Sequence, residues 1–436
     1  ISNQMIKKNK LNIAIVGLGN IGSYLYKYLI KNKSMLKSKT NVIPNIIYVS
    51  AKNKRKNRDL SIRKDMWLDS YIDASKHKEI DLVVELIGGS EGPAKKLVFE
   101  SLKNKKHVVT ANKALIAKYG DELSEIAEKN NVNLEYEAAV CGGVPIIRSL
   151  KESLLANKIS KIYGILNGTS NYILSSMDKN KIEYKDALSR AKKLGYAETN
   201  PSSDLNGDDV ASKIKILTAL SFSSFINNNR ISVEGINKID QIDIINANSL
   251  GYKIKLLGIS EILNNKITQR VHPCLIKKSS YVANIDGVLN AVIINAEPVG
   301  QTVVQGEGAG PEATTSALIS DISSVMRGNV KFPFMLSNKE RKTLNFSNID
   351  NKKFSAYLRL DVLDKQGVMS NITSILSKNK VSIKRLIQNP YKSKKYSSII
   401  IITHKVLDID LRKSIKLISK KKYMFRFPKI IRIEEI

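Results

Sequence analysis

The chain of 436 residues is long enough for two or three domains, and its 42% share of hydrophobic residues is typical of a globular protein. No run approaches the apolar length of a membrane span, no apolar leader precedes the first expected strand, and two cysteines exclude a disulfide framework, which together favour a cytoplasmic protein without a membrane partner. The net charge of +31 is compatible with an anionic partner, but the lysines are spread along the whole chain among many Asn and Ile residues, so base bias in the genome explains the charge equally well, and we predict no nucleic-acid partner.

The first expected strand, residues 12–16, runs directly into a glycine-rich turn, which a helical pattern follows as far as Ile30. The turn has the spacing G-x-G-x-x-G, in which the first glycine permits a tight turn, the second lets backbone amides approach a pyrophosphate, and the third lets helix and strand pack closely. The free N–H groups at the helix start would face the phosphates. A purely structural glycine turn is the alternative. We predict a Rossmann-type, doubly wound α/β domain that binds a dinucleotide through Gly17, Leu18, Gly19, Asn20, Ile21 and Gly22.

The second expected strand, residues 45–50, ends where an NAD-binding domain places an acidic residue for the adenine ribose. Here the chain continues as a basic run, residues 50–58, without an acid before Asp59. Basic side chains favour a 2′-phosphate, so we predict NADP as the cofactor, with Lys52 and Arg58 as the phosphate contacts and NAD as the alternative. A solvated basic loop is the competing interpretation in a chain this rich in lysine.

Three more strands alternate with helical patterns and are expected at residues 81–85, 107–110 and 132–138. Ligands of doubly wound sheets bind at the carboxyl ends of the strands. We therefore predict cofactor contacts from the residues that follow the first two of these strands, namely Gly88, Gly89 and Thr110.

A bridge rich in glycine, residues 136–145, leads out of the first domain. Its irregular backbone offers free carbonyl groups, which could coordinate a hard cation together with the carboxylate of Glu137. Composition alone indicates only a hinge.

The second domain contains the densest group of polar side chains, in residues 191–213, which read AKKLGYAETNPSSDLNGDDVASK. The stretch ends in a helix expected at residues 210–222, and Asp209 and Lys213 share one of its faces at i and i+4. Such a pair can hold an ammonium group beside a substrate carbonyl, and an exposed ion pair is the alternative. Another helix is expected at 184–194, and strands are expected at 159–166, 254–262, 266–276 and 290–295.

The spacing A-x3-G-Y-x-E-x2-P-x2-D-L-x-G-x-D-x3-K in this stretch resembles the signature of homoserine dehydrogenases, and the TANKAL run at 110–115 resembles another part of the same pattern. The resemblance implies the reversible, NADP-dependent reduction of L-aspartate 4-semialdehyde to L-homoserine, a step of threonine, methionine and isoleucine biosynthesis. It implies catalytic roles for Lys213, Asp209 and Lys113. We favour Lys213 as the proton donor, with Lys113 as the alternative; if both lysines approach one oxygen, their repulsion would lower a lysine pKa.

The same resemblance assigns the binding residues. It implies substrate contacts from Gly168, Thr169, Glu198 and Asp204, although Asn167 or Thr169 is also a candidate helix cap. It implies further cofactor contacts from Lys113 and Gly310, a monovalent cation such as Na⁺ at Glu137, Val140, Gly142 and Val144, and a homodimer or higher homo-oligomer. The sequence departs from the family at Cys141 and Ala313, where relatives usually carry a small residue and a proline. We assign His272 no catalytic task, since a lone histidine in a strand is more often structural.

Residues 337–353 are polar and irregular, which predicts a linker to a C-terminal domain at 354–436. The expected order of elements in that domain is βαββαβ, a ferredoxin-like fold. With the turn DKQG at 364–367, this order resembles ACT domains, although relatives mostly have proline where Gln366 stands. The resemblance implies an amino-acid effector and feedback control by threonine; a purely dimerising module is the alternative.

We therefore predict an NADP-binding domain at 1–145, an α+β substrate and dimerisation domain at 146–336 whose residues 303–330 return to the first domain, and the ACT domain at 354–436. Two other functions are open. One is another ACT-tailed amino-acid or hydroxy-acid dehydrogenase, which would not need the 191–213 signature. The other is a non-catalytic amino-acid or nucleotide sensor, and the joint presence of Glu198, Asp204, Asp209, Lys113 and Lys213 argues against it.

Overall fold

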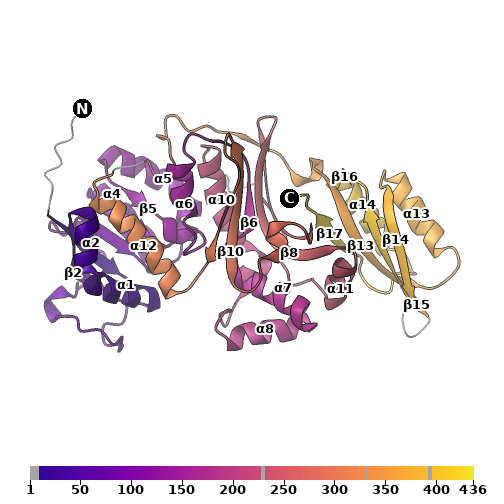
Figure 1. Ribbon diagram of the computed structural model, residues 1–436, viewed down its shortest axis with the longest axis horizontal. Helices are drawn as coiled ribbons and strands as arrows, with labels where there is room; N and C mark the ends of the chain where they lie inside the picture. The colour runs from indigo at the N-terminus through magenta and orange to yellow at the C-terminus, as the bar shows by residue number, and fades with distance from the viewer. Residues whose placement is uncertain (1–8, 227–230, 330–331, 391–394) are drawn as a thin grey trace.

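The computed structural model describes residues 9–226, 231–329, 332–390 and 395–436, and its three parts follow one another along the long axis (Figure 1). The expectation that no leader precedes the first strand concerns mainly residues 1–8, which lie outside the described residues. None of the described helices is both long and apolar enough to span a bilayer.

The N-terminal part is a five-stranded parallel sheet in the order β2-β1-β3-β4-β5, which confirms the predicted doubly wound fold. Its strands are β1 (Lys10–Val16), β2 (Ile43–Ser50), β3 (Leu82–Glu85), β4 (His107–Thr110) and β5 (Leu134–Glu135). The helices around it are α1 (Asn20–Lys31), α2 (Lys33–Thr40), α3 (Asp73–Lys76), α4 (Pro93–Lys103) and α5 (Lys113–Asn130). Strands β3 and β4 are almost entirely buried, as expected for a parallel sheet covered on both faces.

The strand predicted at 132–138 is wrong over most of its length. Only β5 pairs with β4, and the chain then turns into a short 3₁₀ helix, Glu137–Ala139. The N–H of Glu137 donates to Asp321 Oδ2 (2.9 Å) instead of to a neighbouring strand. The contact with Asp321 therefore ends this strand. No local pattern in the sequence predicts where the strand ends.

One late segment belongs spatially to the first part. Helix α12 (Pro311–Met326), coloured orange, lies among the indigo and purple elements in Figure 1 and contacts α1. Its side chains Ala317, Leu318 and Ile322 share a buried apolar cluster with Leu25 and Leu29 of α1. Burial of this face fixes α12 against the nucleotide domain. Residues 303–307, which were predicted to return with it, belong instead to β11 of the middle sheet.

The middle part is an antiparallel sheet in the order β11-β10-β6-β8-β9. Its strands are β6 (Lys158–Ile165), β8 (Tyr252–Leu263), β9 (Lys266–Lys277), β10 (Leu289–Glu297) and β11 (Gly300–Glu307), and β7 (Ile231–Val233) pairs with β9. Its helices are α6 (Ile146–Arg148), α7 (Gly168–Asn180), α8 (Tyr184–Lys193), α9 (Ser202–Asn206), α10 (Asp208–Ser221) and α11 (Gln241–Ser249). The sequence analysis missed β11, α9 and α11: β11 is a half-exposed edge strand and α9 has no buried residue, so neither shows an apolar pattern.

The C-terminal part has the predicted βαββαβ order, and its four main strands lie in the ferredoxin-like sequence β17-β13-β15-β14. Its elements are β13 (Lys353–Leu363), α13 (Val368–Lys378), β14 (Ile383–Pro390), β15 (Tyr396–Thr403), β16 (Val406–Leu407), α14 (Asp408–Ser419) and β17 (Lys429–Ile433). It is not a separate layer, because β17 pairs in parallel with β9. This pairing joins the two sheets into a single twelve-stranded sheet. The C-terminus accordingly lies back against the middle part (Figure 1).

The expected linker at 337–353 is irregular but firmly packed. Arg341 is 5% exposed, and its guanidinium donates to Asp121 Oδ1 and to the carbonyl of Ser224, both at 2.6 Å, between the rings of Phe225 and Phe334. The short strand β12 (Asn345–Phe346) pairs with β9. This segment therefore ties the nucleotide domain to the middle sheet.

Candidate active site

Two lysines from different domains meet on one carboxylate. Helix α10 begins after Gly207, which adopts a left-handed φ of 90°, and carries Asp209 and Lys213 on one face. Asp209 is 4% exposed; its Oδ2 lies 2.8 Å from Lys213 Nζ and its Oδ1 lies 2.9 Å from Lys113 Nζ, at the start of α5. The three predicted catalytic side chains thus lie in one cluster between the nucleotide domain and the middle sheet.

The end of β6 supports this cluster from behind. Lys213 Nζ donates to the carbonyl of Leu166 (2.6 Å), and Asn167 Nδ2 donates to both Asp204 Oδ1 (2.8 Å) and Asp209 Oδ2 (2.9 Å). Asn167 Oδ1 also accepts from the N–H of Ser170 and so caps α7. The sequence analysis considered Asn167 only as a cap and missed its bridge between the two carboxylates.

The charges of the cluster reinforce one another. Burial by itself would raise the pKa of Asp209, but the ammonium groups of Lys213 and Lys113 hold it far below its ordinary value. Burial would likewise lower the pKa of Lys213, yet the charge of Asp209 outweighs it and raises that pKa. The lowered lysine pKa considered from the sequence is therefore not found for Lys213, which is held protonated.

Asp204 differs from Asp209. Burial and the neighbouring charge of Asp209 raise the pKa of Asp204, although Asn167 donates a hydrogen bond to it. An added cationic group, such as a substrate ammonium, would relieve this repulsion. Asp204 lies on the short helix α9.

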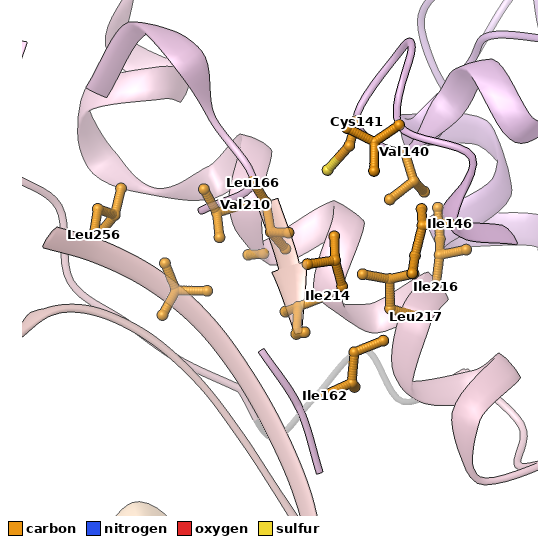
Figure 2. Packing of buried hydrophobic residues seen from close by; sticks show 14 of the residues in the cluster. Val140, Cys141, Ile146, Ile162, Leu166, Val210, Ile214, Ile216, Leu217 and Leu256 are labelled. Carbon is orange, nitrogen blue, oxygen red and sulfur yellow. The ribbon is translucent and has the colours of Figure 1, made fainter. Parts of the chain in front are cut away.

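Val210 and Ile214, the residues of α10 on either side of Lys213, belong to a buried apolar cluster. Val140 and Cys141 of the bridge lie close to Leu166 and to Ile214 of α10 in one buried cluster (Figure 2). Burial raises the pKa of the Cys141 thiol to about 11, so the thiol stays protonated. Because Asp209 and Lys213 are both buried, the attraction between them is stronger than it would be in water.

Gly168 and Thr169, two of the other expected substrate residues, directly follow Asn167 at the start of α7. Gly168 allows a close backbone approach, since a Cβ there would lie 2.6 Å from the carbonyl oxygen of Val288. Thr169 Oγ1 donates to the carbonyl of Tyr196 (2.6 Å) and fixes the loop before α9. Glu198 lies on that loop and is exposed, so it is not part of the buried cluster.

The glycine-rich turn has the geometry that its spacing predicts. Gly17 has φ of 108°, and a Cβ there would lie 2.4 Å from the carbonyl oxygen of Leu86. A Cβ on Gly22 would lie 2.0 Å from the carbonyl oxygen of Gly17, while Gly19 has open space beside it and precedes the first turn of α1. Side chains are thus excluded where strand and helix touch, and the helix N-terminus is left free for an anion.

A hollow of about 300 Å³ opens beside this turn. Its lining includes Leu18, Gly19 and Asn20 of the turn and the basic side chains of Lys27, Lys56 and Arg58. The Arg58 guanidinium donates to three carbonyls, those of Leu18 (2.8 Å), Lys56 (2.7 Å) and Asn53 (2.6 Å), and so orders the basic run. Lys52 is exposed and is not among the lining residues. The sequence analysis missed Lys27, which faces the hollow from α1.

A buried acid organises the ends of β3 and β4. Glu85 is 0% exposed; its Oε1 accepts from the N–H groups of Ile87 (2.8 Å) and Gly88 (2.9 Å), and its Oε2 accepts from Thr110 Oγ1 (2.6 Å). Asn112 Nδ2 donates to the carbonyl of Gly89 (2.7 Å). The predicted cofactor residues after these strands are therefore held in one network. An acid inside an otherwise apolar strand was the signal that could have identified Glu85.

The bridge has the irregular backbone that its glycines predict. Cys141 and Gly142 both have left-handed φ values, 59° and 45°, and a Cβ on Gly142 would lie 2.6 Å from the carbonyl oxygen of Gly308. The carboxylate of Glu137 accepts from the N–H groups of Ile147 (2.9 Å) and Arg148 (2.7 Å). Within the described ranges no group of three or more His, Cys, Asp or Glu side chains is arranged to hold a metal ion, so a cation here would depend on backbone carbonyls.

Comparison with known proteins agrees with this geometry. Residues 17–137 match the family model described as homoserine dehydrogenase, NAD binding domain, and residues 145–323 match the model described as homoserine dehydrogenase. A homoserine dehydrogenase of Helicobacter pylori is 39% identical over 427 residues, which cover 98% of this chain and 100% of the relative. The chain belongs to the homoserine dehydrogenase family.

Solved homoserine dehydrogenases have the same fold. The enzyme of Thiobacillus denitrificans superposes with a TM-score of 0.91 at 36% identity, covering 98% of each chain. A hyperthermophilic archaeal homoserine dehydrogenase, solved in complex with NADPH, superposes with a TM-score of 0.63 at 25% identity over 74% of this chain and 99% of its own. The family membership confirms the enzyme class predicted from the 191–213 signature, an oxidoreductase with an NAD-binding domain.

The bridge of this homoserine dehydrogenase gives a pH-dependent stability. Burial raises the pKa of Glu137 from 4.5 to about 7. Because the folded state binds this proton more tightly than the unfolded state, the contribution of Glu137 is complete below pH 4.5 and is lost as the pH rises to about 7. A shift of this size corresponds to about 3 kcal/mol.

We expect the free energy of unfolding of the wild-type protein to fall by about 3 kcal/mol more than that of Glu137→Gln between pH 4.5 and 8. Urea denaturation at a series of pH values measures both slopes. Parallel slopes would contradict the assignment of the raised pKa to Glu137.

Proposed function

We propose that this enzyme catalyses the reversible, NADP-dependent reduction of L-aspartate 4-semialdehyde to L-homoserine, in threonine, methionine and isoleucine biosynthesis. The observation that carries the proposal is the pairing of one buried carboxylate, Asp209, with Lys113 of the nucleotide domain and Lys213 on α10 of the middle part. The test is the loss of NADPH absorbance on addition of aspartate semialdehyde to the purified protein. An unchanged absorbance would refute the function.

The cofactor supplies the hydride that reaches C4 of the semialdehyde. The oxygen of that carbonyl then carries the negative charge and takes a proton from Lys213 Nζ, which Asp209 keeps protonated. In the reverse direction Lys213 first loses its proton, and the neutral amine then accepts the proton of the homoserine hydroxyl. Lys113 is less buried, with 42% of its side chain exposed, and Asp209 orients it toward the mouth of the site, where it stabilises the oxygen.

The substrate is held by the residues around the mouth: Gly168, Thr169, Glu198 and Asp204. The raised pKa of Asp204 supports a contact with the substrate ammonium group, because a cation would relieve the repulsion between Asp204 and Asp209. Exposed Glu198 reaches the same group only if its loop closes over the substrate.

NADP is the proposed cofactor, with NAD as the alternative. The glycine-rich turn and the residues Gly88, Gly89, Thr110, Lys113 and Gly310 bind its phosphates and nicotinamide half. The basic side chains Lys27, Lys56 and Arg58 around the hollow support a contact with the 2′-phosphate, and the archaeal relative was solved with NADPH. Lys52, which is exposed and does not line the hollow, is proposed as a further contact from the same basic run.

Lys56→Ala is expected to lower kcat/KM with NADPH about tenfold, because one charge-assisted hydrogen bond to the 2′-phosphate is lost. The kcat/KM with NADH should change little, because NADH has no 2′-phosphate. Lys54→Ala is the matched control: this lysine lies in the same basic run but does not line the hollow. Equal losses with both cofactors would contradict a role at the 2′-phosphate.

A monovalent cation, Na⁺, is proposed at the bridge. Glu137 and the carbonyls of Val140, Gly142 and Val144 supply only oxygen ligands, which suits a hard cation, and the buried Glu137 carboxylate lacks a full countercharge. Such an ion would fix the bridge between the domains and would take no part in hydride transfer.

The C-terminal part, residues 354–436, is proposed to be an ACT domain that binds an amino-acid effector, with threonine as the feedback inhibitor, and the enzyme is proposed to be a homodimer or higher homo-oligomer. The βαββαβ order of residues 354–436 supports the assignment of this part as an ACT domain. The test is an inhibition titration with threonine, and glycine is the control. A rate that does not change with threonine would leave this part structural or dimerising.

A further inference from the structure

Glu434, directly after β17, contributes a buried charge to the middle sheet. Glu434, 5% exposed, accepts hydrogen bonds from Arg270 Nε (2.7 Å) and Nη2 (2.9 Å) of β9. It also accepts from His272 Nε2 (2.9 Å), and burial lowers the pKa of His272, which keeps the ring neutral. In the parallel pairing of the two strands, Arg432 lies opposite Cys274. The C-terminus is therefore fixed to β9.

Arg432 extends this contact to a second segment of the middle part. Its Nε and Nη2 donate to Asp408 (2.6 and 3.2 Å), and its Nη1 donates to Glu234 Oε1 (2.8 Å). Glu234 directly follows β7, and its N–H donates to the carbonyl of Val271 in β9 (2.8 Å). One guanidinium thus joins the C-terminal part to the segment of residues 234–236.

The 234–236 segment lies directly against α9. The N–H of Ile236 donates to the carbonyl of Leu205 (2.9 Å). At Gly235 the two backbones approach so closely that a Cβ would lie 2.1 Å from the same carbonyl oxygen. Because there is no space between them, the segment and the helix must move together.

Helix α9 leads straight into the catalytic cluster. It carries Asp204, and Gly207 connects it to α10, which carries Asp209. Gly207 is packed between two strands, since a Cβ on it would lie 3.1 Å from a methyl group of Val233 and 3.1 Å from one of Val271. A shift of the 234–236 segment therefore reaches both carboxylates of the site.

We propose that Glu234 and Arg432 are positioning residues for the reaction: through their contact, the last strand of the chain holds α9 and the start of α10 where Asp204 and Asp209 act. The inference rests on the proposed function for the roles of these two carboxylates. It makes the C-terminal part a component of the catalytic architecture, because a change in β17 is transmitted to the site through three successive contacts.

The test compares two substitutions of Glu234, whose side chain is 46% exposed, so that neither leaves a buried gap. Glu234→Ala removes the acceptor for Arg432, and we expect kcat to fall about tenfold while the Kd for NADPH and the thermal midpoint stay at their wild-type values. Glu234→Gln keeps an acceptor oxygen and should restore most of the turnover. The matched control is Lys405→Ala, which breaks the exposed Lys405–Glu435 pair (2.6 Å) beside the same strand and should leave kcat unchanged.

Hydrogen–deuterium exchange of residues 202–213 provides a readout that is independent of catalysis. Faster exchange in Glu234→Ala than in the wild-type protein and Glu234→Gln supports the proposed route. An unchanged kcat in Glu234→Ala, with or without a lower thermal midpoint, overturns the proposal, and so does a fall in kcat without faster exchange. Failure of the proposed function would be distinguishable, since the wild-type protein would then not oxidise NADPH with aspartate semialdehyde while the exchange difference would still be measurable.

Discussion

Lys213→Ala is expected to lower turnover at least about 100-fold while NADPH binding persists. Lys213 is 8% exposed, and its ammonium group is held by Asp209 and by the carbonyl of Leu166, so bulk water has little access to replace it as a proton donor. The glycine-rich turn, the proposed phosphate site, belongs to the nucleotide domain, whereas Lys213 lies on α10 of the middle part. Steady-state kinetics with aspartate semialdehyde and a fluorescence titration with NADPH measure the two effects separately.

Two neighbours on the same helix provide the controls. Lys215→Ala removes a lysine two residues further along α10, and Asp208→Asn neutralises an exposed acid next to Asp209; both should keep turnover within about a factor of three of the wild-type value. Near-normal turnover of Lys213→Ala would exclude it as the donor. Lys113→Ala would then be the variant expected to lose turnover.

Arg270→Met is expected to lower the free energy of unfolding by about 3 to 5 kcal/mol. Arg270 is 0% exposed and donates to Glu434 and to Glu261 (2.8 Å), so its removal leaves buried carboxylate charge without its main partner. Burial by itself would raise the pKa of Glu434, and the charge of Arg270 holds it well below its ordinary value. Urea denaturation at pH 7 measures the loss.

The control for this effect is Lys405→Met, which breaks a pair that is more than half exposed on both sides and should cost less than about 1 kcal/mol. A double variant, Arg270→Met with Glu434→Leu, should regain a large part of the lost stability, because it removes the stranded charge as well. A loss below about 1 kcal/mol for Arg270→Met would show that water solvates Glu434 in the variant.

The parts of the fold that the sequence predicted correctly are those encoded by local patterns. The parallel strands of the first sheet are short apolar runs between helical patterns, and the glycines of the 17–22 turn have a spacing that few other structures require. The βαββαβ order of the C-terminal part was predicted from local patterns of the same kind. Elements without an apolar face, such as β11 and α9, left no comparable signal.

The site was predictable where its residues share one motif. Asp209 and Lys213 are neighbours on a helix by their spacing alone, and the structure pairs them as that spacing requires. Lys113 lies one hundred residues away, and only the packing of α5 against α10 brings its amine to the same carboxylate. The supporting contacts of Glu85, Asn167 and Lys27 were missed because each depends on a partner in another element.

The sequence by itself determined the family, the nucleotide fold and the helix that carries Asp209 and Lys213, because these follow from residue types at short, fixed spacings. Only the tertiary structure decided that Lys213 is held protonated, that Glu198 is exposed, and that β17 continues the middle sheet instead of ending a separate module. Charge pairing and burial depend on which distant groups the folded chain brings within a few ångströms, and that information is absent from any single stretch of sequence.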